Sequence, residues 1–304
     1  MNIKTTSSIR RVAAFTLVEL AIVLVVVAIL LGGLMVGKDM IHAANLREVP
    51  TQAYEYIAKI QKFRDKYNAL PGDMPNAVQI WGSAADGSYI NGCTDNEFQT
   101  ATRNNPATAT CNGNGNSTIG YHNVHRVNAA GSSADNILAR ELAESLRMWQ
   151  HLHNAGMMKQ KLTGARSAPY LTDFHSATIG ENVPQGPVSP GGYHMRFIDA
   201  ANEENGDDEY FDNLTHRHVL HYGADIPYQE PFLRVLLPKE AFQIDQKLDD
   251  GIPNKGKIAV MRNRVHGDCT AVSGSATIYQ KNVENTAWNG TARSGCVPLF
   301  ITGY

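Results

Sequence analysis

The segment FTLVELAIVLVVVAILLGGLMVG, residues 15–37, decides the fold of this chain. It holds one acidic residue, Glu19, and no charged residue in the 18 positions from Leu20 to Gly37. An α-helix rises about 1.5 Å per residue, so this segment forms a rod of roughly 35 Å, which is long enough to cross a bilayer. A carboxylate in such an apolar helix is costly, and Glu19 is therefore a candidate functional residue.

The helical pattern continues beyond Gly37. Apolar residues recur at spacings of three and four, which is typical of an amphipathic helix: Ala53, Ile57, Ile60, Phe63 and Tyr67. Pro50 should kink this helix rather than abolish it, and the Pro71-Gly72 pair should lie beyond its end. The sequence predicts a helix over residues 15–67 that is transmembrane over 15–37 and amphipathic over 38–67.

Residues 1–14 have the composition of a cytoplasmic leader peptide. They contain Lys4, Arg10 and Arg11 and no acidic residue, so the positive-inside rule keeps them in the cytoplasm and exports the C-terminal part. A cleavable secretory signal is the alternative. It fits poorly for two reasons. The apolar run is longer than a usual signal core, and the candidate signal-peptidase site at Ala43-Ala44-Asn45 lacks a small residue three positions before the cleaved bond.

The segment Arg10–Glu19 resembles the processing site of type IV prepilins and type II secretion pseudopilins. The resemblance implies that a prepilin peptidase cuts between Ala14 and Phe15 and that Phe15 becomes the N-methylated amino terminus. It also implies that Glu19, the fifth mature residue, acts in assembly. The family usually has Gly where this chain has Ala14. The resemblance is specific over residues 10–37, and the segments 67–73, 149–152 and 249–253 show softer similarity to large pilin-like proteins.

The resemblance implies a structural subunit, not an enzyme, of a type IV pilus or a type II secretion pseudopilus. Its partners would be the prepilin peptidase, other pilin or pseudopilin subunits, the inner-membrane assembly machinery and the membrane itself. The chain would lie in the inner membrane with a periplasmic head, and then enter a surface pilus or a periplasmic pseudopilus. The large head favours a minor or specialised subunit. A membrane-anchored binding or adhesive domain that does not polymerise is the alternative, and a secreted enzyme is the third hypothesis.

Residues 68–304 are expected to form one globular head, because about 240 residues can bury a sizeable core. The patterns predict a helix over Ser133–Asn154, a second helix over Lys239–Asp249, and short strands at 193–198, 219–222, 232–237, 257–263 and 277–280. The predicted fold class is α+β: a pilin-like lollipop with a loop-rich head and short antiparallel strands. The formal net charge of −2 gives no reason to expect a nucleic-acid partner.

The four cysteines are expected to form disulfides if the head is exported. The sequence permits three pairings. Pairing of neighbours, Cys93 with Cys111 and Cys269 with Cys296, is preferred because each pair brackets a loop rich in Gly, Asn and Thr.

Asp245, Asp249 and Asp250, which precede Gly251, are the candidate metal ligands. Calcium takes six to eight oxygen ligands on a turning backbone, and acids at the end of a helix oppose its dipole unless something compensates them. The family resemblance strengthens this hypothesis, since some pseudopilins bind calcium near the C-terminus.

Three other polar segments have simpler interpretations, and no catalytic sequence motif is present. The acidic segment 202–213 is interpreted as a solvated loop, and Asn112–Gly115 as a pair of tight turns. His216, His218 and His221 are interpreted as exposed histidines and not as zinc or copper ligands, because in a strand His221 would face away from the other two and the three would not converge on a metal.

Overall fold

The computed structural model describes residues 16–82, 109–120, 133–164, 177–198, 214, 217–224, 231–261, 269–273, 276–280, 287–288, 292–293 and 295–303. The chain divides into two compact units, Met1–Ala44 and Asn45–Tyr304. Helix α1 (Leu17–Tyr67) contributes residues to both units. Each unit is described by itself below.

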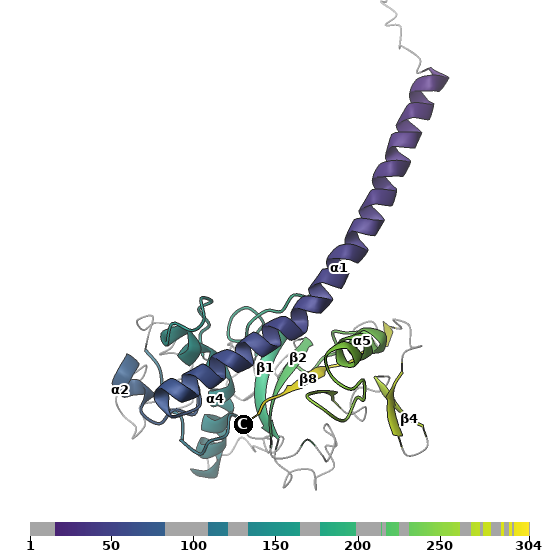
Figure 1. Cartoon of the computed structure of the whole chain (residues 1–304). Coiled ribbons are helices and arrows are strands. Elements are labelled where there is room, and N and C mark those ends of the chain that lie inside the picture. Colours follow the sequence, from purple (N-terminus) through teal and green to yellow (C-terminus); the bar gives the residue numbers. More distant parts are fainter. Residues whose placement is uncertain are drawn as a thin grey trace, which may run out of the picture. The chain divides into compact units, whose positions relative to one another are not determined.

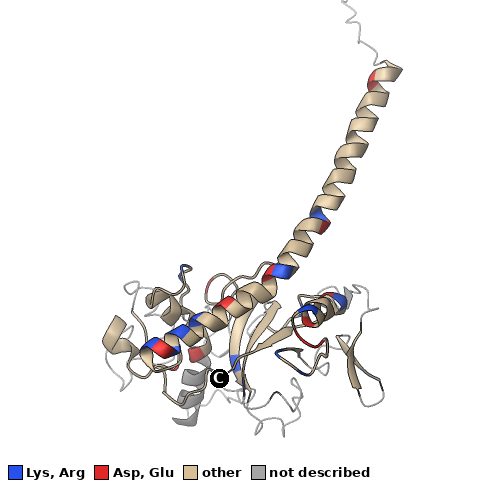
Figure 2. Ribbon diagram, viewed as in Figure 1, with Lys and Arg blue, Asp and Glu red and all other residues tan. Residues whose placement is uncertain are grey.

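The first unit is the apolar part of α1. Its large side chains from Leu17 to Ile41 are exposed, and Figure 2 shows the long stretch without charged residues. In the part of the chain that the structure describes, α1 is the one helix long and apolar enough to span a membrane, judged by length and composition. The long N-terminal helix predicted from the sequence is confirmed.

The second unit is built on a four-stranded antiparallel sheet with the order β1-β2-β8-β3. The strands are β1 (Gly191–Ile198), β2 (Arg217–Ala224), β3 (Ile258–Val260) and β8 (Pro298–Ile301). The helices are α2 (Ala77–Trp81), α4 (Ser133–Asn154) and α5 (Pro238–Leu248). The described residues of this unit also form two small hairpins: β4 (Thr270–Ser273) with β5 (Ala276–Tyr279), and β6 (Ala287–Trp288) with β7 (Ala292–Arg293). This arrangement confirms the α+β class.

The main core lies where the C-terminal part of α1 crosses the sheet (Figure 1). The ring of Tyr56 contacts Trp149 of α4 and Tyr193 of β1 edge to face, at centroid distances of 5.0 and 5.2 Å. The hydroxyl of Tyr193 donates a hydrogen bond of 2.7 Å to the carbonyl oxygen of Val49. Residues 45–67 are therefore an integral part of the head.

The opposite face of the sheet is also buried, and this overturns one expectation from the sequence. A second apolar cluster, which includes Ile198, Val219 and Leu299, covers that face. Side chains of the central strand β2 alternate between the two clusters, with Leu220 in the first and Val219 in the second, so both of its faces are enclosed. His218 and His221 are consequently buried, at 2% and 0% exposure, and not exposed as interpreted. His216 lies outside the described residues.

Other segments also differ from the sequence prediction. Residues 232–237 form isolated bridges at Leu233 and Leu236 instead of a strand. Strand β8, which pairs with both β2 and β3, was not predicted. It is short and begins with a proline, so its local pattern is weak. Its pairing comes from the long-range fold.

Gly72 lies in the segment between α1 and α2 and packs against α4. It adopts φ +87°, and a Cβ atom there would overlap the carbonyl oxygen of Glu144. Its amide donates a hydrogen bond of 2.9 Å to Nδ1 of His151. Gly180 has a similar φ of +90°, but a Cβ atom there would meet nothing within 4 Å. The two glycines thus share a positive φ and differ in packing.

We expect Gly72→Ala to destabilise the protein much more than Gly180→Ala. Both alanines incur the left-handed penalty of roughly 1–2 kcal/mol, and Gly72→Ala adds an overlap with backbone that costs a further 1–3 kcal/mol or so. Urea unfolding of the detergent-solubilised chain measures the difference. Equal losses of stability in the two variants would show that the contact with Glu144 does not constrain Gly72.

Candidate functional site

Thr16 and Glu19 form a reciprocal capping box at the start of α1. The backbone amide of Glu19 donates to Oγ1 of Thr16 at 3.2 Å. In return, the amide and the hydroxyl of Thr16 both donate to Oε2 of Glu19 at 2.9 Å. These bonds satisfy amides that a helix N-terminus otherwise leaves without partners. They also turn the carboxylate back toward the N-terminal tip of the helix.

The geometry of Glu19 suits an electrostatic role at that tip. Its carboxylate lies at the positive end of the helix dipole. Both hydrogen bonds from Thr16 end on Oε2, and within the described residues Oε1 keeps its lone pairs for a second donor. Ala14 and Phe15, the predicted processing residues, lie outside the described residues.

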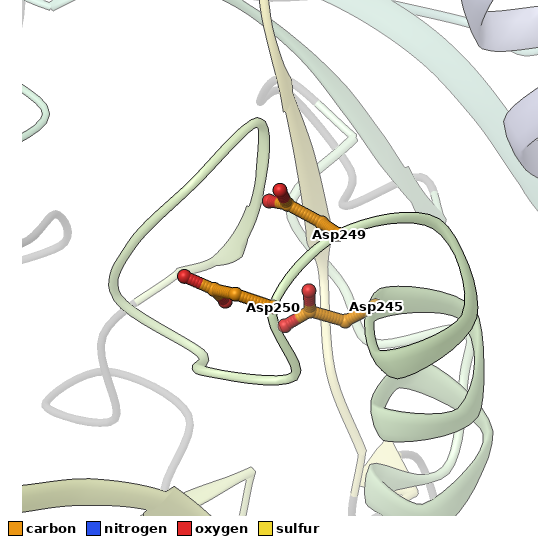
Figure 3. A group of neighbouring side chains, drawn as sticks. All are labelled: Asp245, Asp249 and Asp250. Atoms are coloured by element: carbon orange, nitrogen blue, oxygen red, sulfur yellow. The ribbon is translucent and has the colours of Figure 1, made fainter.

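The predicted cluster of Asp245, Asp249 and Asp250 does come together. Each residue offers one carboxylate oxygen, and these three atoms lie within 4.8 Å of one another. Asp245 projects from the last turn of α5, while Asp249 and Asp250 begin the loop that follows it (Figure 3). Among the described residues, this is the one group of at least three His, Cys, Asp or Glu side chains with such a geometry.

Backbone and side-chain donors already organise this cluster. Asp245 accepts hydrogen bonds from the Gly251 amide at 3.1 Å and the Tyr279 hydroxyl at 2.8 Å. Asp249 accepts from the amides of Lys257 and Ile258, and Asp250 from that of Ile252. Burial raises the pKa of Asp245 to about 6, although its two hydrogen bonds oppose that shift. The three acids therefore order the loop that follows α5, and they also provide oxygens that a cation could bind.

The chemistry of this cluster fits a hard cation. Carboxylate oxygens are the ligands that calcium prefers, and backbone carbonyls or waters complete its shell of six to eight oxygens. A bound cation would also compensate three acids gathered at the C-terminal end of a helix. Calcium binding by Asp245, Asp249 and Asp250 remains a prediction.

Asp73 is a polar site that the sequence interpretation missed. Its carboxylate accepts hydrogen bonds from three consecutive amides, Gly115 at 2.6 Å, Asn116 at 3.0 Å and Ser117 at 2.9 Å. Successive amides of this kind form an anion-binding nest, as in phosphate loops. Here the anion is the protein's own carboxylate. Burial raises the pKa of Asp73 to about 6 against the opposing effect of the three amides.

His151 joins two segments that are distant in sequence. Its Nδ1 accepts the amide proton of Gly72 at 2.9 Å, so the ring proton is assigned to Nε2, which lies 3.0 Å from the hydroxyl of Thr110. That hydroxyl donates to Oε1 of Gln150 at 2.7 Å. Burial lowers the pKa of His151 to about 3, so the ring is neutral at physiological pH. The segments 67–73 and 149–152 thus contact each other.

The structure contains the disulfide between Cys269 and Cys296, with Cα atoms 5.0 Å apart. It ties the start of the β4–β5 hairpin to the residues that lead into β8. Cys111 is also disulfide-bonded. Its predicted partner, Cys93, lies outside the described residues, and that pairing stays a prediction.

Comparison with known families places the motif at the N-terminus. Residues 9–35 match the model of the prokaryotic N-terminal methylation motif. The chain therefore carries the prepilin motif of type IV pilins and pseudopilins, and its apolar helix fits membrane anchoring before assembly. No curated protein and no solved structure matches the chain.

If the aspartate cluster binds calcium, excess calcium should raise the melting temperature relative to a chelator. A ligand that binds the folded state alone stabilises it by RT ln(1 + [L]/Kd), or about 2.7 kcal/mol at a hundredfold excess over Kd. Calorimetry of the wild type and Asp250→Asn measures this effect. Asp250 is exposed, so its change should reduce the calcium shift with little effect on the metal-free protein. Identical melting in calcium and in chelator would refute the site.

Proposed function

We propose that this protein is a structural subunit of a type IV pilus or a type II secretion pseudopilus that assembles through α1 after prepilin peptidase cleavage. The match of residues 9–35 to the N-terminal methylation motif carries the proposal. That motif leads directly into an apolar helix with exposed side chains and a single acid in its first turn. Those exposed side chains require either lipid or the helices of other subunits.

In this proposal, Glu19 is the assembly residue. Cleavage between Ala14 and Phe15 creates a positively charged amine, and methylation of that amine keeps the charge. Within an apolar surrounding, an uncompensated amine is expensive. Oε1 of Glu19 in one subunit would accept a hydrogen bond from the amine of a neighbouring subunit, while Oε2 keeps its hydrogen bonds from Thr16. Apolar contacts between helices are similar at many axial offsets, so this charged pair sets the axial register of the filament.

The proposed partners and location follow from the same motif. The prepilin peptidase acts on the leader, and other pilin or pseudopilin subunits and the inner-membrane assembly machinery take the mature chain. The head is periplasmic before assembly. The long second unit, Asn45–Tyr304, supports a minor or specialised subunit, with a layer of heads around a core of α1 helices.

A second candidate is a membrane-anchored exported binding or adhesive domain that does not polymerise. The observation that favours it is the exposed apolar surface of α1, since lipid alone satisfies that surface. The two candidates differ in the fate of the leader and in the role of Glu19.

Mass spectrometry of the mature N-terminus should find methylated Phe15 as the first residue. The same strain without its prepilin peptidase should retain the leader through Ala14, because the peptidase makes the cut. A chain that keeps Met1 in the presence of the peptidase would favour the non-polymerising anchor, and a start near Asn45 would indicate a secreted protein.

Replacing Glu19 should block filament incorporation while membrane insertion and cleavage continue. Loss of one partner of a buried charge pair costs about 3–5 kcal/mol. Glu19→Gln is the most informative change, because glutamine preserves the capping box and removes the charge. Glu19→Ala should lose incorporation as well, and Glu19→Asp should be intermediate because its reach is shorter. Sheared surface filaments, or cross-linked pseudopili, provide the measurement.

Glu55→Gln is the matched control. Glu55 is an exposed acid on the same helix, paired with Lys59 at 3.4 Å, and its loss should leave incorporation unchanged. Normal incorporation of Glu19→Gln would contradict the charge-pair mechanism and favour the membrane-anchored binding domain.

A further inference from the structure

A pocket of about 500 Å³ lies within the second unit where α1 ends. Its polar lining comes from Arg64, Asn68, Asp73, Ser117 and His218. Leu70 and Pro75 contribute apolar surface. A volume of this size is in the range of small-molecule sites, which combine apolar walls with a few well-placed polar groups.

Hydrogen bonds hold the walls of this pocket in place. The amide of Asn68 donates to the carbonyl oxygen of Arg64 at 2.8 Å and closes the last turn of α1. The amide of Ser117 donates to Asp73, and that of Ile119 donates to Nε2 of His218 at 3.0 Å. These bonds fix the backbone of Asn68 and Ser117 before any ligand arrives, so binding need not supply the entropy cost of ordering that backbone.

The backbone of the pocket contains two conformations that are costly for side chains. In the part of the chain that the structure describes, Asn68 and Ser117 are the non-glycine residues with positive φ, at 51° and 67°. Both line the pocket. Asparagine is common at the left-handed position after a helix, which accounts for Asn68. Serine has no such preference, and glycine would adopt this φ at residue 117 with a lower conformational free energy. Strain retained in this way often accompanies a functional site.

The charges of the pocket select the class of ligand. Arg64 disfavours a cation, whereas the negative end of the α1 dipole disfavours an anion. The guanidinium of Arg64 can only donate hydrogen bonds, whereas an amide or hydroxyl, as in Asn68 and Ser117, donates and accepts. A ligand that matches these donors and acceptors is neutral and has several hydroxyl groups. It also has C–H surfaces that can pack against Leu70 and Pro75.

We propose that this pocket binds a neutral saccharide unit. The sugar hydroxyls would contact Arg64, Asn68 and Ser117, and its C–H face would lie against Pro75. The proposal concerns the second unit alone and holds whether or not the chain polymerises.

Saturation-transfer NMR of the full chain in a sugar-free detergent tests the proposal. The probes are glucose, galactose, mannose, N-acetylglucosamine and N-acetylgalactosamine at millimolar concentration, with N-acetylneuraminate as the anionic comparison. We expect signal transfer to at least one neutral sugar in preference to N-acetylneuraminate. No transfer to any neutral sugar, or preference for N-acetylneuraminate, overturns the proposal.

Two variants locate the binding. Arg64→Gln should weaken the affinity for the neutral sugar about tenfold, equivalent to about 1.4 kcal/mol. Lys62→Gln, an exposed neighbour on α1 that does not line the pocket, should leave it unchanged. Equal effects of these two changes overturn the assignment to this pocket.

Ser117→Gly separates a binding role from a structural one. Glycine relieves the left-handed strain, so the melting temperature should be maintained or should rise, while the loss of the hydroxyl weakens sugar binding severalfold. Unchanged affinity in Ser117→Gly would show that Ser117 does not contact the sugar.

Discussion

Burial of one face of α1 between Val49 and Phe63 is the constraint on which the second unit depends. Val49, Ala53, Ile60 and Phe63 are completely buried, and Tyr56 lies among them against α4 and β1. The C-terminal part of a long helix thus supplies a wall of the head's core. A single helical stretch cannot bury its apolar face alone, so the sheet and α4 form around it. The same continuous helix contributes the exposed apolar residues of the first unit.

Buried polar groups give the head its specific connections. Tyr193 reaches the carbonyl of Val49, His151 reaches the amide of Gly72, and Asp73 occupies the amide nest of residues 115–117. Each of these bonds joins segments at least 42 residues apart in the chain. A buried donor or acceptor without a partner costs about 1–3 kcal/mol. Such bonds therefore favour one arrangement of the loops around α1 over others with similar apolar burial.

The two acidic sites illustrate different uses of carboxylates. Asp73 is enclosed by amides, and its role is to organise the loop around it. Asp245, Asp249 and Asp250 also receive amide bonds, but their oxygens converge at the end of α5 (Figure 3). Convergence of several acids creates repulsion that a cation would relieve. Glu19 is different again, because it caps its own helix through Thr16 and in the proposed filament would gain a further partner from another chain.

Residues 15–67 show what the sequence by itself determined about this protein. The uninterrupted apolar run, the acid at residue 19 and the later periodicity of three and four are local signals, and helices form from local hydrogen bonds. Helices α1, α4 and α5 were predictable for this reason. Strands β1 and β2 were predictable from their own short apolar segments, and Asp245, Asp249 and Asp250 come together because they are close in sequence. Tertiary structure alone decided the pairing of β8 with β2 and β3, the burial of His218 and His221, and the capture of Asp73 by residues 115–117. These features depend on contacts between segments that are distant in the chain. The local sequence pattern of one segment does not indicate which other segment it will contact.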